Sequence, residues 1–507
     1  MIGPLEDNLQ SVWNPWHVQR AILESDESLF HTRYLFYPQD FSLTMHTLSL
    51  TNAFFQAFLN LFFPLSYCYN LTLFLSFVLA GYFNFLLCYE FTQHREASFI
   101  GGLLFSFCPY HIARSLHHIN LASIFWVPLL VFCIIRSFHY PHYSYYWKIT
   151  LVYLLIVFTD YYYFLFAVGL GGIFALANWK KSKYLLMSLL FTFLLFFPVV
   201  LWTLSDLKTF HYPVNTVYDR GILDFMSFFV PPPWHSVWGK LSLHYFYNRL
   251  NVNPWEMVGY LGYFVLGFAI YGWIQSRSSK EIRLLGWIGF FSLILALGSP
   301  IHIFGKSTIP GFYWITKYFP LLGIIRVPSR WIVISHLVLS VFASFGIMKW
   351  LERKKNKKWS CMVLVGILFF EYSCIPLPYS KVSVSSFYEK IAKDTERYAI
   401  LNIPYRIYPY SNYYMYLQTV HGKPILFGQV SRVYREAYRF LVRNHLDQFC
   451  QNFEITADQR ELFRENQIRY LVVHKFLLED VEKTQLKLNK EFDIFFEDQQ
   501  IVVYHLK

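Results

Sequence analysis

The sequence predicts a mainly α-helical protein, a polytopic transmembrane helix bundle followed by a small C-terminal α/β domain. Hydrophobic residues make up 55% of the 507 residues and charged residues only 15%, whereas soluble domains have roughly 25% charged residues. After the last long apolar run, short strand-like pieces alternate with polar helical pieces. Three parts are expected: a first external loop at 1–66, the bundle at 67–376 and an external α/β domain at 377–507.

The first loop begins with an acidic pair, Glu6 and Asp7, at the start of the amphipathic stretch EDNLQSVWNPWHVQRAIL. We expect the apolar face of this helix to rest on lipid headgroups. Its residues are Trp13, Trp16, Val18 and Leu23. Carboxylates at that position are placed to meet a substrate with one polar end and one lipid end. The alternative is that the pair only stabilises the helix start, through the helix dipole and the free N–H groups.

The next segment, TLSLTNAFFQAFLNLFF at 48–64, is apolar but carries a polar stripe. Asn52, Gln56 and Asn60 recur at a spacing of four residues, so they share one face of a helix. This pattern predicts an interfacial or re-entrant helix more than a lipid-exposed span.

Ten apolar runs are candidate membrane spans, judged against the roughly 20 residues that cross the hydrocarbon core. They are residues 68–89, 97–110, 121–138, 147–159, 161–178, 184–203, 257–275, 284–298, 329–350 and 359–376. The second and fourth are short. Both are expected to rely on flanking aromatic residues or to be broken helices buried by their neighbours.

Basic residues lie in every second connection between these runs, as the positive-inside rule requires. The other connections, which carry aromatic, histidine and carboxylate side chains, are expected outside. They are 1–47, 111–120, the turn at Asp160, 204–256 and 299–328. The formal charge of +12 therefore indicates topology and not a nucleic-acid partner. Seven scattered cysteines without a CxxC pair argue for neither disulfides nor zinc.

No membrane helix precedes the external segment at the N-terminus. One explanation is that the chain as written lacks a first helix, which would have brought this segment across the membrane. The alternative is that the downstream charge bias sets the orientation unaided.

Asp160 is the strongest candidate among ionisable groups near membrane depth. It lies between two apolar runs in LLIVFTDYYYFLFAV, where a carboxylate is costly to bury unless a partner or a function compensates. A site role and a simple cap on the following helix both remain open.

Charged residues of two other outer connections, or at their ends, are further candidates. Asp224 and Glu256 bracket the long connection 204–256, where ordinary loop roles are the alternative. Arg326 and Arg330 flank Pro328 at the outer mouth of a span, a position the positive-inside rule disfavours. Their planar donor groups suit a phosphate, and pairing with a loop carboxylate is the alternative.

The stretch PYHIARSLHHINLAS predicts a further outer helix that carries Arg114, His117 and His118 on one side or on adjacent faces. Together with His111, the histidines form a possible set of metal ligands. Neutral histidines that hydrogen-bond to carbonyls or headgroups are the commoner arrangement. No cofactor is therefore expected, and the sequence does not indicate a divalent metal.

Several stretches, which together extend over nearly the whole chain, resemble bacterial polytopic proteins of the GT-C glycosyltransferase superfamily. They are the first loop EDNLQSVWNPWHVQRAIL with LFHTRYLFYPQDFSLTMHTLSLTNAFF, then SFCPYHIARSLHHINLAS, FTDYYYFLF, LDFMSFFVPPPWHSVWG, GIIRVPSRW, YMYLQTVHGKPILFGQVSR and IRYLVVHK. The resemblance implies a GT-C type bundle in the bacterial cytoplasmic (inner) membrane, with the C-terminal domain on the periplasmic side.

The resemblance also implies a reaction. GT-C enzymes place an acidic residue in the first external loop, and Asp7 matches that position with Glu6 beside it. They transfer a sugar from a polyprenyl-phosphate donor, here to a glycan, lipid or protein acceptor. Asp160 would be a second acidic residue, and Arg326 and Arg330 would face the carrier phosphate. Further expected substrate contacts are Arg114, His118, Asp224 and Glu256.

Two other classes remain open. A lipid-linked sugar flippase or transporter would also use polar groups inside a bundle, with its site near the bilayer midplane. A non-catalytic envelope assembly protein would tolerate loss of the acidic residues. No GxGxxG, Walker loop, HExxH or Ser-His-Asp arrangement supports a competing chemistry.

Overall fold

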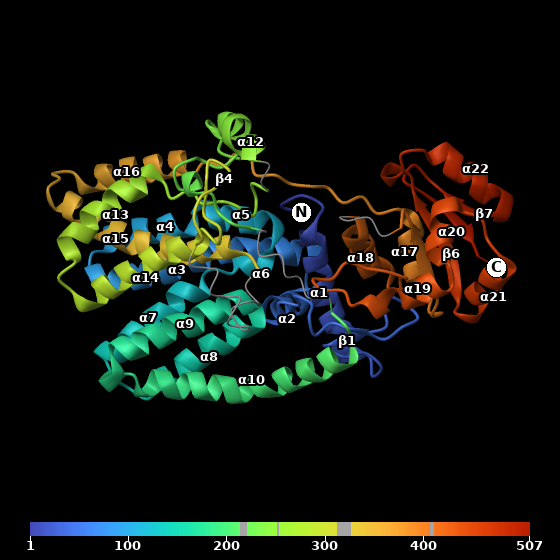
Figure 1. Cartoon of the computed structure of the whole chain (residues 1–507), viewed down its shortest axis with the longest axis horizontal. Helices are drawn as coiled ribbons and strands as arrows, with labels where there is room; N and C mark the ends of the chain where they lie inside the picture. The colour runs from blue at the N-terminus through green and yellow to red at the C-terminus, as the bar shows by residue number, and fades with distance from the viewer. Residues whose placement is uncertain (213–220, 251–252, 312–325, 406–409, 507) are drawn as a thin grey trace. The chain divides into compact units, whose positions relative to one another are not determined.

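A computed structural model describes residues 1–212, 221–250, 253–311, 326–405 and 410–506 (Figure 1). Parts of the predicted outer connections 204–256 and 299–328 lie outside the described residues. The chain divides into two units. The first, here called the loop unit, comprises Met1–Asn70, Pro198–Val214 and Tyr379–Lys507; the second, the helical unit, comprises Leu71–Phe197 and Asn215–Pro378. Each is described by itself, and the three-part division expected from the sequence stays a prediction.

Each of the ten predicted spans contains a helix, as backbone groups inside lipid require. In order these are α3 (Leu65–Thr92), α4 (Arg95–Ser106), α7 (Trp126–His139), α8 (Ser144–Thr159), α9 (Tyr161–Ala177), α10 (Lys183–Thr209), α13 (Tyr263–Ser276), α14 (Lys280–Ala296), α15 (Ile332–Glu352) and α16 (Lys357–Glu371). Within the described part of the chain, four helical stretches are long and apolar enough to cross a membrane: Leu65–Thr92, Ile119–His139, Lys183–Thr209 and Pro328–Glu352. The predicted mainly α membrane fold is confirmed; crossing by the shorter helices stays a prediction.

The short predicted span at 97–110 is a broken helix buried by its neighbours, as expected. α4 ends at Ser106, and Pro109 opens α5 (Pro109–His117) at a position where a missing N–H costs nothing. Two glycines let α4 approach its neighbours closely. A Cβ on Gly101 would lie 2.0 Å from Ser344 Oγ on α15, and one on Gly102 would lie 2.5 Å from the carbonyl oxygen of Gly81 on α3. Close backbone approach through small residues is typical of helix packing in membranes.

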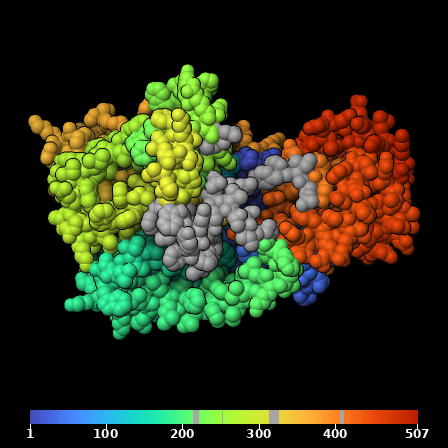
Figure 2. Space-filling model, viewed as in Figure 1, coloured from blue at the N-terminus to red at the C-terminus, as the bar shows by residue number. Residues whose placement is uncertain are grey.

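The C-terminal segment contains the predicted α/β structure, with all four expected strands. These are β5 (Ala399–Ile403), β6 (Ile468–His474), β7 (Ile494–Glu497) and β8 (Ile501–His505). The sheet order is β5-β6-β8-β7, with β5 parallel to β6 and the other pairs antiparallel. The helices α21 (Ala457–Glu465) and α22 (Val481–Glu491) accompany the sheet (Figure 1). In Figure 2 the orange and red atoms of this segment form one continuous mass.

The first loop folds as α1 (Asp7–Leu23), the short strands β1 (His31–Thr32) and β2 (Phe41–Ser42), and α2 (Leu50–Leu59). The prediction that the apolar face of α1 rests on lipid headgroups is wrong for three of the four residues named for it. Trp13, Trp16 and Val18 are buried, at 0%, 5% and 0% exposure, and only Leu23 is exposed. The reason is that α1 packs against α18 (Tyr410–His421), so its apolar face meets protein. Hydrophobic periodicity does not distinguish a protein neighbour from a lipid one.

α2 has the polar stripe that the sequence predicts, and the stripe faces inward. Asn52 and Gln56 are buried, while Phe54, Phe55 and Phe58 on the other side are exposed. The helix is tied to α1 by a hydrogen bond from Gln19 Nε2 to the carbonyl oxygen of Ala57, 2.9 Å long. An exposed phenylalanine face fits the interfacial helix expected here; its contact with lipid stays a prediction.

Candidate functional site

Asp7 occupies the first turn of α1, where the helix dipole favours a negative charge. Its side chain is half-buried, and Oδ1 accepts a hydrogen bond from Asn412 Nδ2 at 3.2 Å. Glu6 precedes the helix at the N-cap position, but its side chain makes no capping hydrogen bond. The side chain of Glu6 therefore does not cap the helix. The Asp7 carboxylate is oriented by Asn412, a residue of α18.

α1 is held in place by buried polar contacts as well as by apolar packing. Trp13 Nε1 donates to Gln418 Oε1 on α18 at 2.7 Å. The amide of Gln418 in turn donates to the carbonyl oxygens of Tyr34 and Lys423, at 2.7 and 2.9 Å. This one glutamine thus joins α1, the first loop and the chain after α18. Because buried polar groups must find partners, the network fixes how α1 lies on α18.

His46 forms a second anchor for α1. Asn14 Nδ2 donates to the carbonyl oxygens of Thr47 and Leu48, so Asn14 Oδ1 is left to accept from His46 Nε2, 3.1 Å away. His46 Nδ1 is then the acceptor for the backbone N–H of Ser431 at 3.3 Å. Burial lowers the pKa of His46 to about 3, with a further lowering from His17 and a partial offset from the negative charge of Asp7. The ring is therefore neutral and held in one tautomer near neutral pH.

The helical unit contains a cluster of charges centred on Glu256. Arg114 of α5 pairs with Glu256 Oε2 and donates to the carbonyl oxygen of Trp255. Arg330, in the 3₁₀ turn Pro328–Trp331, contacts Glu256 Oε1 through Nε at 3.1 Å and Nη2 at 2.9 Å. The side chain of Arg114 is 1% exposed and that of Arg330 is 13% exposed. Two largely desolvated cations therefore share one carboxylate.

The charge state of this cluster follows from its partners. Burial would raise the pKa of Glu256, but the positive charges of Arg114 and Arg330 outweigh burial and hold the pKa well below its usual value. His118 acts on Glu256 in the same direction. Glu256 is thus ionised at neutral pH. The group of two arginines and one glutamate carries a net positive charge, which favours a negatively charged partner.

Asp160 caps α9, one of the two roles left open by the sequence. Its Oδ1 accepts from the N–H groups of Tyr162 and Tyr163, at 2.8 and 3.1 Å, and its Oδ2 accepts from Asn120 Nδ2 at 2.7 Å. Tyr162 also connects this turn to the arginines. Its hydroxyl accepts from the backbone N–H of Arg326 at 3.1 Å, and its ring lies 4.4 Å beneath the guanidinium of Arg330.

The structure therefore brings together most of the residues predicted for the helical unit. The connected group is Arg114, His118, Asp160, Glu256, Arg326 and Arg330. For Arg330 the contacts match the alternative of pairing with a loop carboxylate. Phosphate binding by Arg326 and Arg330 stays a prediction. Arg330 contacts Glu256 through Nε and Nη2 and not through Nη1.

Asp224 makes a different set of contacts. It caps the 3₁₀ turn Phe225–Phe228 by accepting from the N–H of Met226 at 2.9 Å. It also accepts from the N–H groups of Phe304 and Gly305, at 3.2 and 2.7 Å, in the turn between β3 (His302–Ile303) and β4 (Lys306–Ser307). No hydrogen bond or ion pair given for the described residues connects it to Glu256. Its predicted substrate contact therefore has no support from this geometry.

We expect Asp224→Ala to lower the free energy of unfolding by about 2–4 kcal/mol, because three backbone N–H groups lose their acceptor. Thermal unfolding of the detergent-purified protein measures this. Asp224→Asn retains one carbonyl oxygen and is expected to lose less. Equal stability of Asp224→Ala and the wild type would refute a structural role for this side chain.

The histidines of the predicted outer helix take hydrogen-bonding and packing roles. His111 Nδ1 lies 2.6 Å from the carbonyl oxygen of Ser106, and Nε2 lies 3.1 Å from Ser76 Oγ. The His117 ring packs on Trp255 with ring centres 4.9 Å apart. Among the residues that the structure describes, no three His, Cys, Asp or Glu side chains are placed to share a metal ion.

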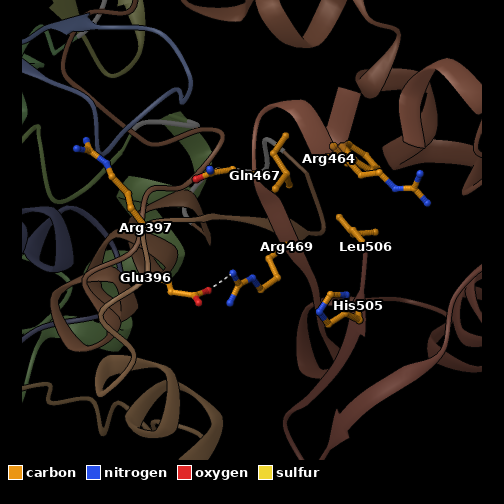
Figure 3. Close-up of a pocket in the computed structure, with 9 residues that line it drawn as sticks. Glu396, Arg397, Arg464, Gln467, Arg469, His505 and Leu506 are labelled. Atoms are coloured by element: carbon orange, nitrogen blue, oxygen red, sulfur yellow. Dashed lines mark hydrogen bonds and ion pairs between the residues drawn. The ribbon is translucent and has the colours of Figure 1, made fainter. Parts of the chain in front are cut away.

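The C-terminal sheet carries an open pocket of about 500 Å³ (Figure 3). Three arginines line it, but their guanidinium groups do not converge. Arg469 faces Glu396 and pairs with it, whereas the guanidinium groups of Arg397 and Arg464 point away from Arg469. Arg397 pairs with Asp26 at 2.7 Å. The pocket is therefore not a preformed site for an anion.

Sequence reasoning missed several side chains of both candidate sites. Asn412, Asn120 and Tyr162 contact the predicted acids and arginines, yet they are uncharged. A charge-based search passes over such residues. The only local signal was for Tyr162 and Asn120, which lie within stretches that carry the family resemblance.

Comparisons with known proteins place this geometry on a recognised fold. The model of a family described as a domain of unknown function, DUF6311, matches residues 9–370. No curated protein matches the chain. Similar solved structures are the arabinofuranosyltransferase AftD from Mycobacteria, ArnT from Cupriavidus metallidurans bound to undecaprenyl phosphate, and the apo oligosaccharyltransferase of Archaeoglobus fulgidus.

These likenesses show the fold. The TM-scores are 0.63 for AftD, 0.53 for ArnT and 0.52 for the oligosaccharyltransferase, at 12%, 11% and 11% identity. The matches cover 100%, 100% and 94% of this chain. The chain spans 38% of the length of AftD, 94% of ArnT and 66% of the oligosaccharyltransferase. The predicted GT-C architecture is therefore confirmed.

Proposed function

Since the chain belongs to the DUF6311 family and has the GT-C fold, we propose that it is a membrane glycosyltransferase. It transfers a sugar from a polyprenyl-phosphate donor to an acceptor hydroxyl on the outer face of the cytoplasmic membrane. The acceptor is a glycan, a lipid or a protein. The donor class is supported by ArnT, a similar structure that was solved with undecaprenyl phosphate bound.

The observation that carries the proposal is the environment of Asp7. Its carboxylate is at the N-terminus of α1, half-buried and hydrogen-bonded to Asn412. A general base needs an ionised, oriented and accessible carboxylate. The helix dipole and the amide donor both favour the ionised form. The loop position matches the acid expected of a GT-C enzyme.

The proposed reaction needs little covalent chemistry from the protein. The acceptor oxygen forms a bond to the anomeric carbon, while the bond from that carbon to the phosphate oxygen breaks. The hydroxyl proton moves to Asp7, and the electron pair leaves with the polyprenyl phosphate. Positioning and neutralisation of the phosphate supply most of the acceleration.

The group around Glu256 is proposed to bind the carrier phosphate. Arg330 and Arg114 give it a net positive charge, and the guanidinium of Arg330 also lies over the Tyr162 ring, 4.4 Å from its centre. Glu256 holds both guanidinium groups in place, which lowers the reorganisation needed when phosphate binds. Arg326, Asp160 and His118, which are connected to this group, are proposed to contribute to the same phosphate site, and Glu6 is proposed to assist Asp7.

Vesicles of defined orientation test this proposal. We expect label from a panel of tritiated undecaprenyl-phosphate sugars to enter acceptor material only when the face that corresponds to the cell exterior can reach the donor. Vesicles without the protein are the control. Movement of intact lipid-linked sugar across the bilayer without cleavage would support a transporter and contradict the proposal.

A further inference from the structure

Asn412 is fully buried in α18, yet it lies 405 positions from Asp7 in the sequence and contacts its carboxylate. Asn412 Nδ2 donates to Asp7 Oδ1 at 3.2 Å. Asn412 Oδ1 is also buried and has no hydrogen-bond partner among the described residues. Leaving a buried acceptor unsatisfied lowers the stability of the fold. A buried amide oxygen without a hydrogen-bond partner, in a side chain that contacts a carboxylate, calls for a functional explanation.

The orientation of this amide follows from charge. With the amide reversed, Asn412 Oδ1 would face an Asp7 oxygen at about hydrogen-bond distance, and the two would repel unless the acid were protonated. The N–H therefore faces Asp7 in its ionised state. This arrangement favours the charged carboxylate over the neutral acid.

The packing of α1 against α18 fixes the position of the contact between Asp7 and Asn412. Asp7 meets Asn412, and Trp13 meets Gln418, six residues further along each helix. α1 and α18 thus run in the same direction here, and two hydrogen bonds fix both their stagger and their rotation. His46 anchors α1 independently through Asn14. Asp7 is therefore held by a rigid frame in which a C-terminal helix supplies the orienting group.

We propose that Asn412 is a positioning residue for Asp7: it orients the carboxylate toward the acceptor hydroxyl and keeps it ionised. The inference rests on the proposed function, in which Asp7 is the base. This role of Asn412 makes the C-terminal segment, through α18, part of the catalytic apparatus. Asn412 acts through Asp7, and its own buried side chain need not touch the substrate.

The test compares Asn412→Ala with Asn412→Asp, using a readout at Asp7 that does not need turnover. Carbodiimide labelling of carboxyl groups in the detergent-purified protein, mapped by mass spectrometry, reports protonation of Asp7 as pH falls. We expect labelling to begin about one pH unit higher in Asn412→Ala, because the ionised form loses a donor. It should begin higher still in Asn412→Asp, which brings two carboxyl groups together. Ser411→Ala, a buried neighbour on α18, should leave the labelling curve unchanged.

Turnover of a tritiated undecaprenyl-phosphate sugar gives the second readout. For Asn412→Ala we expect kcat near pH 6 to fall about tenfold, the acid limb of the pH–rate profile to move upward, and KM for the donor to stay constant. Unchanged labelling and rate profiles in both Asn412 variants, with Asp7→Asn inactive, would overturn this inference alone. Full activity of Asp7→Asn would overturn the proposed function, and this inference with it.

Discussion

Asp7→Asn is expected to reduce sugar transfer by about 10²–10⁴-fold, the usual contribution of a general base. The substitution keeps the size and polarity of the side chain, so α1 should remain packed on α18 through Trp13 and Gln418. What it removes is the ability to accept the hydroxyl proton. The rate of label transfer from an undecaprenyl-phosphate sugar by the purified variant, at equal protein concentration, measures the loss.

Asp26→Asn is the matched control for this variant. Asp26 is an acid of the same first loop, but it pairs at the surface with Arg397 at 2.7 Å and Arg33 at 3.6 Å. Such pairs contribute little to stability, and we expect transfer by Asp26→Asn to stay near the wild-type rate. An equal loss in both variants would indicate general damage to the loop and not the removal of a base.

Glu256→Gln is expected to give the largest loss of stability, about 3–5 kcal/mol in the free energy of unfolding near neutral pH. The variant leaves the buried guanidinium groups of Arg114 and Arg330 without their shared counter-charge. Thermal unfolding measures the effect. Glu352→Gln, which removes the exposed partner of Lys349, is the control and should change stability by less than about 1 kcal/mol.

The difference in the free energy of unfolding between wild type and Glu256→Gln should depend on pH in a definite direction. The pKa of Glu256 is depressed in the folded protein relative to its usual value of 4.5. The ionised group therefore stabilises the fold above that value, and the contribution disappears as pH falls through the folded-state pKa. This difference in the free energy of unfolding, the stability gap between wild type and Glu256→Gln, should be largest at neutral pH and shrink only in strong acid. A gap that shrinks between about pH 7 and 5 would contradict this assignment.

The helices and strands were predictable because their signals are local. Ten apolar runs predicted ten helices, and four strand-like pieces predicted β5 to β8. The lipid-facing assignment of Trp13 and Trp16 was wrong because the partner, α18, lies some 400 residues away in sequence. Periodicity records that a face is apolar, not what covers it.

The candidate site was predictable in part. Charge at the ends of spans identified Arg114, Glu256 and Arg330, and topology placed Arg114 and Glu256 in outer connections and Arg330 at the outer mouth of a span. Their pairing depends on how three distant connections fold together, which spacing does not encode. Asn412 carried no charge and no motif, so only the contact with Asp7 identifies it.

Release of polyprenyl phosphate by the purified protein tests the central claim most directly. Wild-type protein and Asp7→Asn, at equal concentration in the same vesicles, would be given a tritiated undecaprenyl-phosphate sugar panel with periplasmic extract as acceptor. We expect the wild type to release undecaprenyl phosphate in step with labelled acceptor for at least one donor, and Asp7→Asn to release almost none. Equal release by the two proteins, or no cleavage of any donor by the wild type, would contradict it.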